Sequence, residues 1–296
     1  MIGTPFFALC LALTAPSEAE GKTEEIEEIE ETPIEETSES EGWYGKDYAV
    51  YDRLLSLYSP TPIRKRSFQM VVNHRTNQAF TEDAFQSFLG FDSGALRIGL
   101  GLRYGIFDFL DVGVYRINAN ASLGQDVYEF DVRGQFLHEK KHVVNMALRS
   151  GVTWFSQKNA KDAAGGFAQL LASKLLWHRL QLTGGLLYHS SSTGDNSFNG
   201  KRKLASDTDW SMAASGGFEI RLTDLVALTW ETTVPFAGYR GDMPAMAGGV
   251  KLITNRHTFA IVTSNYPLMS SDGVVAGSNR DKQWVIGFNI TREIGI

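Results

Sequence analysis

The chain has 296 residues, of which 43% are hydrophobic and 21% charged, and its formal net charge is -6 at pH 7. The hydrophobic share is too high for an intrinsically disordered chain, and the length allows one or two folded domains. No run approaches eighteen apolar residues, so the sequence predicts no membrane-spanning helix. Membrane-spanning strands, which alternate, are not excluded.

The first residues favour export. The apolar stretch from Phe6 to Ala15 has the length of a secretory hydrophobic region, and Ala15 and Ala19 suit a cleavage site. No Lys or Arg precedes the stretch, which departs from a typical leader. We predict a signal peptide over residues 1–19. Its removal would take away Cys10, the single cysteine, and with it any disulfide, thiolate metal site or cysteine nucleophile.

An acidic segment follows the leader. Residues 18–41 hold twelve Glu and one Lys, and such a segment cannot bury enough apolar surface to offset its ordering entropy. We predict a disordered acidic arm over residues 20–42. Without these charges, the 28 basic and 34 acidic residues fall to 27 and 22, so residues 42–296 carry a net charge of about +5.

Residues 43–64 are predicted to form a short amphipathic helix and a linker. Tyr51, Leu54, Leu55 and Tyr58 occupy positions i, i+3, i+4 and i+7, and two prolines follow. We expect this helix to pack against the folded body. The alternatives are that it lies on a membrane surface or enters the lumen of a barrel.

From residue 65 onward, the hydrophobic period changes to two. In residues 96–106, Leu, Ile and Tyr alternate with Arg and Gly, and the same scheme recurs in later segments of ten to twelve residues. Strands of this length can cross a bilayer at a tilt, aromatic residues lie near their ends, and short turns alternate with long loops. The pattern predicts an all-β fold: an antiparallel transmembrane β-barrel of about twelve strands over residues 65–296.

The segment from Ser87 to Arg116 resembles the opening hairpin of a bacterial family of outer-membrane β-barrels known only as a domain of unknown function. The resemblance is carried by GFDS at 90–93, RIGL at 97–100, YG at 104–105 and LDVGV at 110–114. The sequence departs from that family at the turn, where Phe107 and Phe109 replace polar residues. The resemblance implies a fold and a membrane, and it implies no reaction.

Charged residues of both signs fall on the predicted inward faces of the strands. We expect them to form an ion-pair network across the lumen. Twelve strands enclose more space than the eight that side chains can fill and less than the sixteen of an open channel, so a filled barrel and a narrow passage both remain open. The predicted network comprises Arg97, Arg103, Glu129, Asp131, Arg133, Arg149, Glu219, Arg221, Glu231 and Lys251.

Two motifs suggest catalysis. His138-Glu139-Lys140-Lys141-His142 spells the HExxH pattern of zinc proteases, but it lies between two predicted strands, where the two histidines cannot share a helical face. We therefore predict a hairpin turn at 138–141 and no metal site.

The second motif is a His–Ser pair. His189 and Ser191 share an inward face, as in barrel-type outer-membrane lipid hydrolases, where His activates Ser. Asn196 is the candidate orienting residue, with Asp195 and Asn199 as alternatives. The simpler interpretation is a polar strand end that enters a loop.

The sequence therefore predicts a protein of the bacterial outer membrane, surrounded by its lipids, with a non-enzymatic role as a structural barrel or a narrow channel for small solutes. The alternatives are a lipid hydrolase that uses His189 and Ser191, and a scaffold whose acidic arm recruits a periplasmic partner. No cofactor motif and no nucleic-acid-binding module is recognised.

Overall fold

The structure is a computed structural model. It describes residues 52–76, 96–120, 125–157, 163–191, 210–254, 256–266, 269–278 and 284–295. The predicted signal peptide, the predicted acidic arm and residues 43–51 lie outside these ranges.

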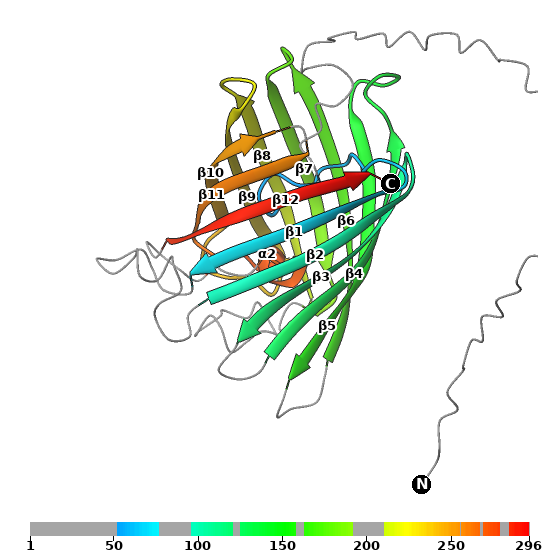
Figure 1. Cartoon of the computed structure of the whole chain (residues 1–296). Helices are drawn as coiled ribbons and strands as arrows, with labels where there is room; N and C mark the ends of the chain where they lie inside the picture. The colour runs from blue at the N-terminus through cyan, green and yellow to red at the C-terminus, as the bar shows by residue number, and fades with distance from the viewer. Residues whose placement is uncertain are drawn as a thin grey trace, which may run out of the picture. The chain divides into compact units, whose positions relative to one another are not determined.

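Twelve antiparallel strands form a closed barrel (Figure 1). Each strand pairs with its neighbours in the sequence, and the first pairs with the last, from Ser67 opposite Gly295 to Arg75 opposite Gly287. The predicted fold class is therefore confirmed. The strands are β1 (Ser67–Thr76), β2 (Leu96–Phe107), β3 (Leu110–Asn120), β4 (Gln125–Leu137), β5 (Asn145–Gln157), β6 (Ala163–Leu176), β7 (Leu180–His189), β8 (Ser211–Arg221), β9 (Val226–Gly238), β10 (Ala245–Ile253), β11 (His257–Ser264) and β12 (Val285–Gly295).

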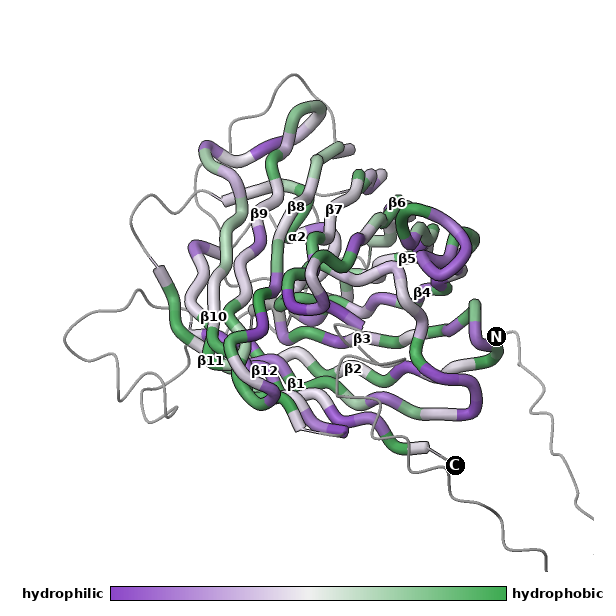
Figure 2. The backbone as a smooth tube through the Cα atoms, turned by 90° about the horizontal axis from the view of Figure 1, so that it is seen from above, coloured by the Kyte–Doolittle hydropathy of each residue, from purple (hydrophilic) through white to green (hydrophobic). Residues whose placement is uncertain are grey.

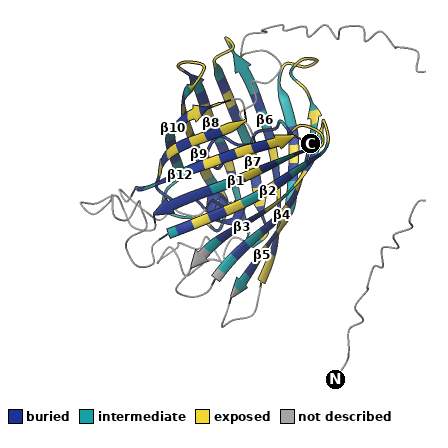
Figure 3. Ribbon diagram, viewed as in Figure 1, coloured by how far each residue is buried: buried dark blue, intermediate teal, exposed yellow. Residues whose placement is uncertain are grey.

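The barrel has an apolar outer face and a polar inner face. Along β11, exposed and buried residues alternate without a break, with His257, Phe259, Ile261 and Thr263 pointing outward. Figure 3 shows buried and exposed residues alternating along much of the other strands, and Figure 2 shows hydrophobic and hydrophilic residues interspersed along the same backbone. A water-soluble sheet would bury its large apolar side chains, whereas here they cover the outside and charged side chains are enclosed.

One rim of the barrel carries the short connections, which span residues 108–109, 138–144, 177–179, 222–225 and 254–256; we call it the short-turn rim. The HExxH motif lies there, between β4 and β5, in a turn as predicted. The turn is longer than the predicted 138–141, and β5 begins only at Asn145. The Asn145 side chain accepts a hydrogen bond from the main-chain N–H of Glu139 (2.8 Å) and so holds the wider turn together.

The short helix predicted within residues 43–64 does not form over the residues that the structure describes, whereas the alternative that this segment enters the lumen of a barrel is confirmed. Residues 52–62 are irregular, with one antiparallel bridge between Arg53 and Tyr58, and they lie inside the barrel. We call them the luminal hairpin. Its leucines pack in different directions, Leu54 against Leu171 and Leu55 against alanines of β10 and β11. A helix would present them on one face, whereas the lumen surrounds the segment with wall on several sides.

A second insert enters from the β11–β12 connection. Its described residues, 269–278, include the helix α2 (Ser271–Val275), and we call them the luminal loop. Val275 packs with Phe167 and Leu187 of the wall, and Val274 belongs to the same buried cluster as Leu55 of the luminal hairpin. The two inserts therefore meet inside the barrel. Among the residues described, no helix is both long and apolar enough to cross a membrane.

Candidate functional site

The inward faces of β2 to β5 carry six charged side chains that form a continuous chain of buried ion pairs. Each strand of this region contributes at least one charge, and acidic and basic groups alternate across it. Because a buried charge without a partner is very unfavourable, this alternation allows so many charges to be enclosed. The pairs are Arg103–Asp111, Arg103–Asp131, Arg133–Asp111, Arg149–Asp131 (3.0 Å) and Arg149–Glu129 (3.2 Å).

A second cluster lies across the lumen on β8 and β10. Lys251 Nζ lies 2.7 Å from one oxygen of Glu219, and Arg221 Nε lies 3.8 Å from the other. Arg97, near the opposite end of β2, donates to the main-chain oxygen of Asn118 (3.3 Å). The structure thus places the predicted network in separate groups rather than one.

Glu231 on β9 has no ion pair with a cation among the described residues, contrary to our expectation, and instead binds the luminal hairpin. Its carboxylate accepts hydrogen bonds from the main-chain N–H groups of Leu55, Ser56 and Leu57 (2.9–3.0 Å) and from the hydroxyl of Tyr266 (2.7 Å). Three consecutive N–H groups around one anion form a nest, which stabilises the charge as a cation would. The turn of the hairpin is therefore the partner of this carboxylate.

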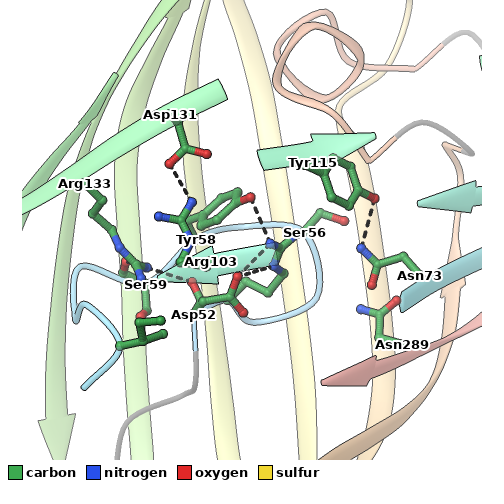
Figure 4. A network of polar contacts seen from close by, with 12 residues as sticks. Asp52, Ser56, Tyr58, Ser59, Asn73, Arg103, Tyr115, Asp131, Arg133 and Asn289 are labelled. Carbon is green, nitrogen blue, oxygen red and sulfur yellow. Dashed lines mark hydrogen bonds and ion pairs between the residues drawn. The ribbon is translucent and has the colours of Figure 1, made fainter. Parts of the chain in front are cut away.

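Tyr58 of the luminal hairpin lies within a cage of guanidinium groups. The ring centroid is 3.7 Å from Arg149, 4.2 Å from Arg53, 5.3 Å from Arg103 and 5.9 Å from Arg133. The phenol oxygen also accepts a hydrogen bond from Arg53 Nη2 (2.8 Å). Figure 4 shows Tyr58 beside Arg103 and Asp131, on the hairpin that crosses the lumen. Cation–π attraction, strengthened by desolvation, therefore anchors the hairpin in the ion-pair chain.

Asp52 at the start of the hairpin stays charged in this environment. Burial by itself would raise the pKa of Asp52, but Arg53, whose side chain bonds the carboxylate at 2.6–2.8 Å, holds that pKa below its ordinary value, assisted by Arg103 and Arg133. The hairpin thus brings its own ion pair into the lumen.

The luminal loop is bound at the other end of the ion-pair chain, at Glu129. The main-chain N–H and the hydroxyl of Ser271 both donate to Glu129 (3.0 and 2.7 Å), and the hydroxyl lies 3.4 Å from that of Thr153. Glu129 is therefore shared between Arg149 and the loop, so the ion-pair chain contacts both inserts.

The structure does not assemble the catalytic pair predicted from His189 and Ser191. His189 is fully buried; its Nδ1 accepts a hydrogen bond from the main-chain N–H of Ser191 (3.1 Å), and its Nε2 lies 3.0 Å from the hydroxyl of Thr153. In this conformation, both ring nitrogens are thus engaged with groups other than the Ser191 hydroxyl. Asn196, like Asp195 and Asn199, lies outside the described residues. The lipid hydrolase therefore stays a prediction.

Little open space remains around Tyr58 inside the barrel. The two cavities beside Tyr58 hold about 10 Å³ each, room for a single water molecule. Around Tyr58, the lumen is therefore filled by residues of the chain itself.

Sequence reasoning missed several polar side chains of this site, because most of them lie on the luminal hairpin or in the β11–β12 connection and Asp111 was read only as part of a strand motif. A signal was present in β10 and β11, where the inward residues Ala245, Ala247 and Ala260 are small and leave room for an inserted side chain. The missed residues include Asp52, Arg53, Tyr58, Asp111, Tyr266 and Ser271.

Comparison with known proteins supports the fold. Residues 52–294 match the protein family described as "Membrane bound beta barrel domain (DUF5777)", so the matched region includes the luminal hairpin. No curated protein is significantly similar in sequence.

Three solved structures are similar in fold. They are KdgM porin (TM-score 0.47, 5% identity, 76% of this chain and 98% of that one), NanC porin (0.47, 11%, 78% and 100%) and the COG4313 outer membrane channel from Pseudomonas putida F1 (0.46, 13%, 78% and 96%). At such identities and TM-scores they do not indicate what this barrel does.

Proposed function

The chain belongs to the DUF5777 family of membrane-bound β-barrel domains, and from that premise we propose that it forms a narrow passage for small solutes in the bacterial outer membrane, closed at rest by its own luminal hairpin. The charged inner wall suits hydrated polar solutes, and the apolar outer face suits the acyl chains of membrane lipids.

The observation that carries this proposal is how the hairpin is held. Among the described residues, it continues into the sheet only at β1, and its partners inside the lumen are side chains such as Glu231, Arg133 and Arg149 rather than a strand ladder. A segment held in this way can leave without breaking the barrel, because all twelve strands remain paired.

Planar-bilayer conductance tests the proposal with two variants of the full chain. Tyr58→Ala removes the caged ring, which should weaken hairpin docking by about 3–5 kcal/mol. Glu231→Gln replaces one acceptor oxygen by an amide that opposes the N–H groups of the nest and should cost about 1.5–3 kcal/mol. We expect the wild-type protein to be almost silent and both variants to show discrete openings.

Lys174→Ala is the matched control, because Lys174 pairs with Glu139 at the short-turn rim (2.8 Å), where both side chains are partly exposed and contact neither insert. Its conductance should equal that of the wild type. If Tyr58→Ala and Glu231→Gln both fold and stay silent, the passage is refuted. A permanent structural barrel, favoured by the complete burial of Leu55 and Arg133, is then the better function.

The acidic arm supports a separate proposal, in which it recruits a basic periplasmic protein. Its eleven Glu within residues 20–42 are a dense anionic ligand. Capture of a periplasmic protein by the full chain, but not by a variant with these Glu replaced by Gln, would support this partner. Equal capture by both would contradict it.

A further inference from the structure

The lumen wall recognises the main chain of the luminal hairpin at many points. Four main-chain oxygens of the hairpin accept hydrogen bonds from the wall. Arg133 Nη1 donates to the oxygens of Asp52 and Ser59 (3.1 and 2.8 Å), Lys251 to that of Arg53 (3.3 Å) and Asn289 to that of Leu55 (2.9 Å). These donors come from β4, β10 and β12, so the wall surrounds the segment.

The wall also supplies acceptors. Besides the three N–H groups that Glu231 binds, the main-chain N–H of Ile63 donates to Asp111 (2.9 Å), at the point where the chain leaves the lumen. Since main-chain groups are present in every peptide, these contacts recognise a bent peptide backbone and not one particular sequence.

Two features of the wall select side chains. The guanidinium groups of Arg103, Arg133 and Arg149 receive an aromatic ring, here that of Tyr58. The small side chains of β10 and β11 form an apolar recess that receives Leu55. An aromatic residue three positions after a leucine would satisfy both features.

We propose that the lumen is a peptide-binding site, occupied in cis by residues 52–59, and that its ligands in trans are short peptides with an aromatic and a leucine side chain. This inference rests on the proposed displacement of the hairpin and names the solute class of the passage. The wall groups that bind the hairpin would bind the incoming peptide in the same way.

The tethered hairpin competes with any peptide in solution. A segment attached to the barrel acts at an effective concentration of about millimolar, so the intact protein should bind a free peptide poorly. Weakening the hairpin without changing the wall should raise the apparent affinity, because a larger fraction of the protein is then unoccupied.

Fluorescence anisotropy of the detergent-solubilised full chain measures this competition. The probe is a labelled, capped peptide with the sequence DRLLSLYSPTP of residues 52–62. Tyr58→Ala should bind the probe at least tenfold more tightly than the wild-type chain. The double variant Tyr58→Ala/Glu231→Gln should lose that gain, and so should a probe whose tyrosine is replaced by alanine. Heat-modifiable migration on gels verifies that each variant is folded.

Limited proteolysis of residues 52–62 reports whether the hairpin has left the lumen, and Leu55→Asp, which places a carboxylate beside Glu231, is a second way to expel it. If the hairpin is released and the probe still binds no more tightly, the peptide site is refuted. If the hairpin stays protected in both variants, it is a permanent core and the inference also fails. Conductance without peptide binding would support the proposed passage and refute the peptide-binding site. Peptide binding without conductance would support the binding site and refute the passage.

Discussion

At the scale of single residues, each buried charge of the ion-pair chain depends on a partner of opposite charge. Arg133 and Arg149 are fully enclosed, and each is acceptable there only because carboxylates lie at hydrogen-bond distance. Asp131 illustrates the dependence, since it holds Arg103 on one oxygen and Arg149 on the other. Its loss would leave two guanidinium groups short of a partner.

Asp131→Asn should therefore destabilise the folded barrel by about 3–5 kcal/mol, because it uncovers buried charge. Asp126→Asn is its control: the pair of Asp126 with Arg116 (2.8 Å) is partly exposed, so its loss should cost at most about 1 kcal/mol. The temperature at which each variant loses heat-modifiable migration on gels measures the difference. If both variants lost heat-modifiable migration at the same temperature, the buried chain of ion pairs would add no stability.

At the scale of elements, the two inserts occupy the lumen of a barrel of intermediate width. The luminal hairpin continues from the short-turn rim, where β1 begins, and the luminal loop comes from the β11–β12 connection (Figure 1). Val274 of the loop packs in the same cluster as Leu55 of the hairpin, so a passage requires the loop to yield when the hairpin leaves.

A disulfide should test whether the loop must move. The hydroxyl oxygens of Thr153 and Ser271 are 3.4 Å apart, so Thr153→Cys with Ser271→Cys, in a Cys10→Ser background, places two thiols within reach of a bond. Added to Tyr58→Ala, the oxidised pair should abolish conductance, and reduction should restore it.

The control for that disulfide is Ser215→Cys with Thr233→Cys. These residues face each other across β8 and β9 with hydroxyls 2.9 Å apart, so the bond joins two wall strands and neither insert. It should leave the conductance of Tyr58→Ala unchanged. If the loop disulfide were equally without effect, the loop would not be part of the closure.

At the scale of the whole molecule, the distribution of polarity is inverted relative to a water-soluble protein. Ile261 in β11 is 50% exposed and Leu222 in the β8–β9 turn is 49% exposed, so accessibility alone does not distinguish them. Their positions distinguish the two residues, because Ile261 lies in the middle of its strand and Leu222 lies at the short-turn rim.

Ile261→Arg should cost about 2–4 kcal/mol in lipid vesicles and Leu222→Arg at most about 1 kcal/mol, because the penalty for a charge on the lipid face depends on depth. Unfolding by denaturant in vesicles measures both. In a water-soluble protein, both exposed substitutions would lie within about 0.5 kcal/mol of the wild type, and that outcome would contradict the membrane orientation.

The sequence alone determined the barrel, its approximate strand number and the inward position of the charges. The inward position follows from a period of two, which is local, so residues 96–106 show it without knowledge of the rest of the chain. The strand number follows from how many such segments the chain contains. The hairpin turn at the HExxH motif was predictable for the same reason, because it lies between two such segments.

Only the tertiary structure decided what fills the lumen. The spacing of Leu54, Leu55 and Tyr58 suits a helix as well as a compact hairpin, and the choice is made by Glu231, about 175 residues later in the chain, which binds three main-chain N–H groups of the turn. The partner of each inward charge is likewise set by register and by the inserts. Contacts between segments so far apart in sequence leave no periodic trace, and therefore the position of the hairpin inside the lumen could be recognised only in the folded molecule.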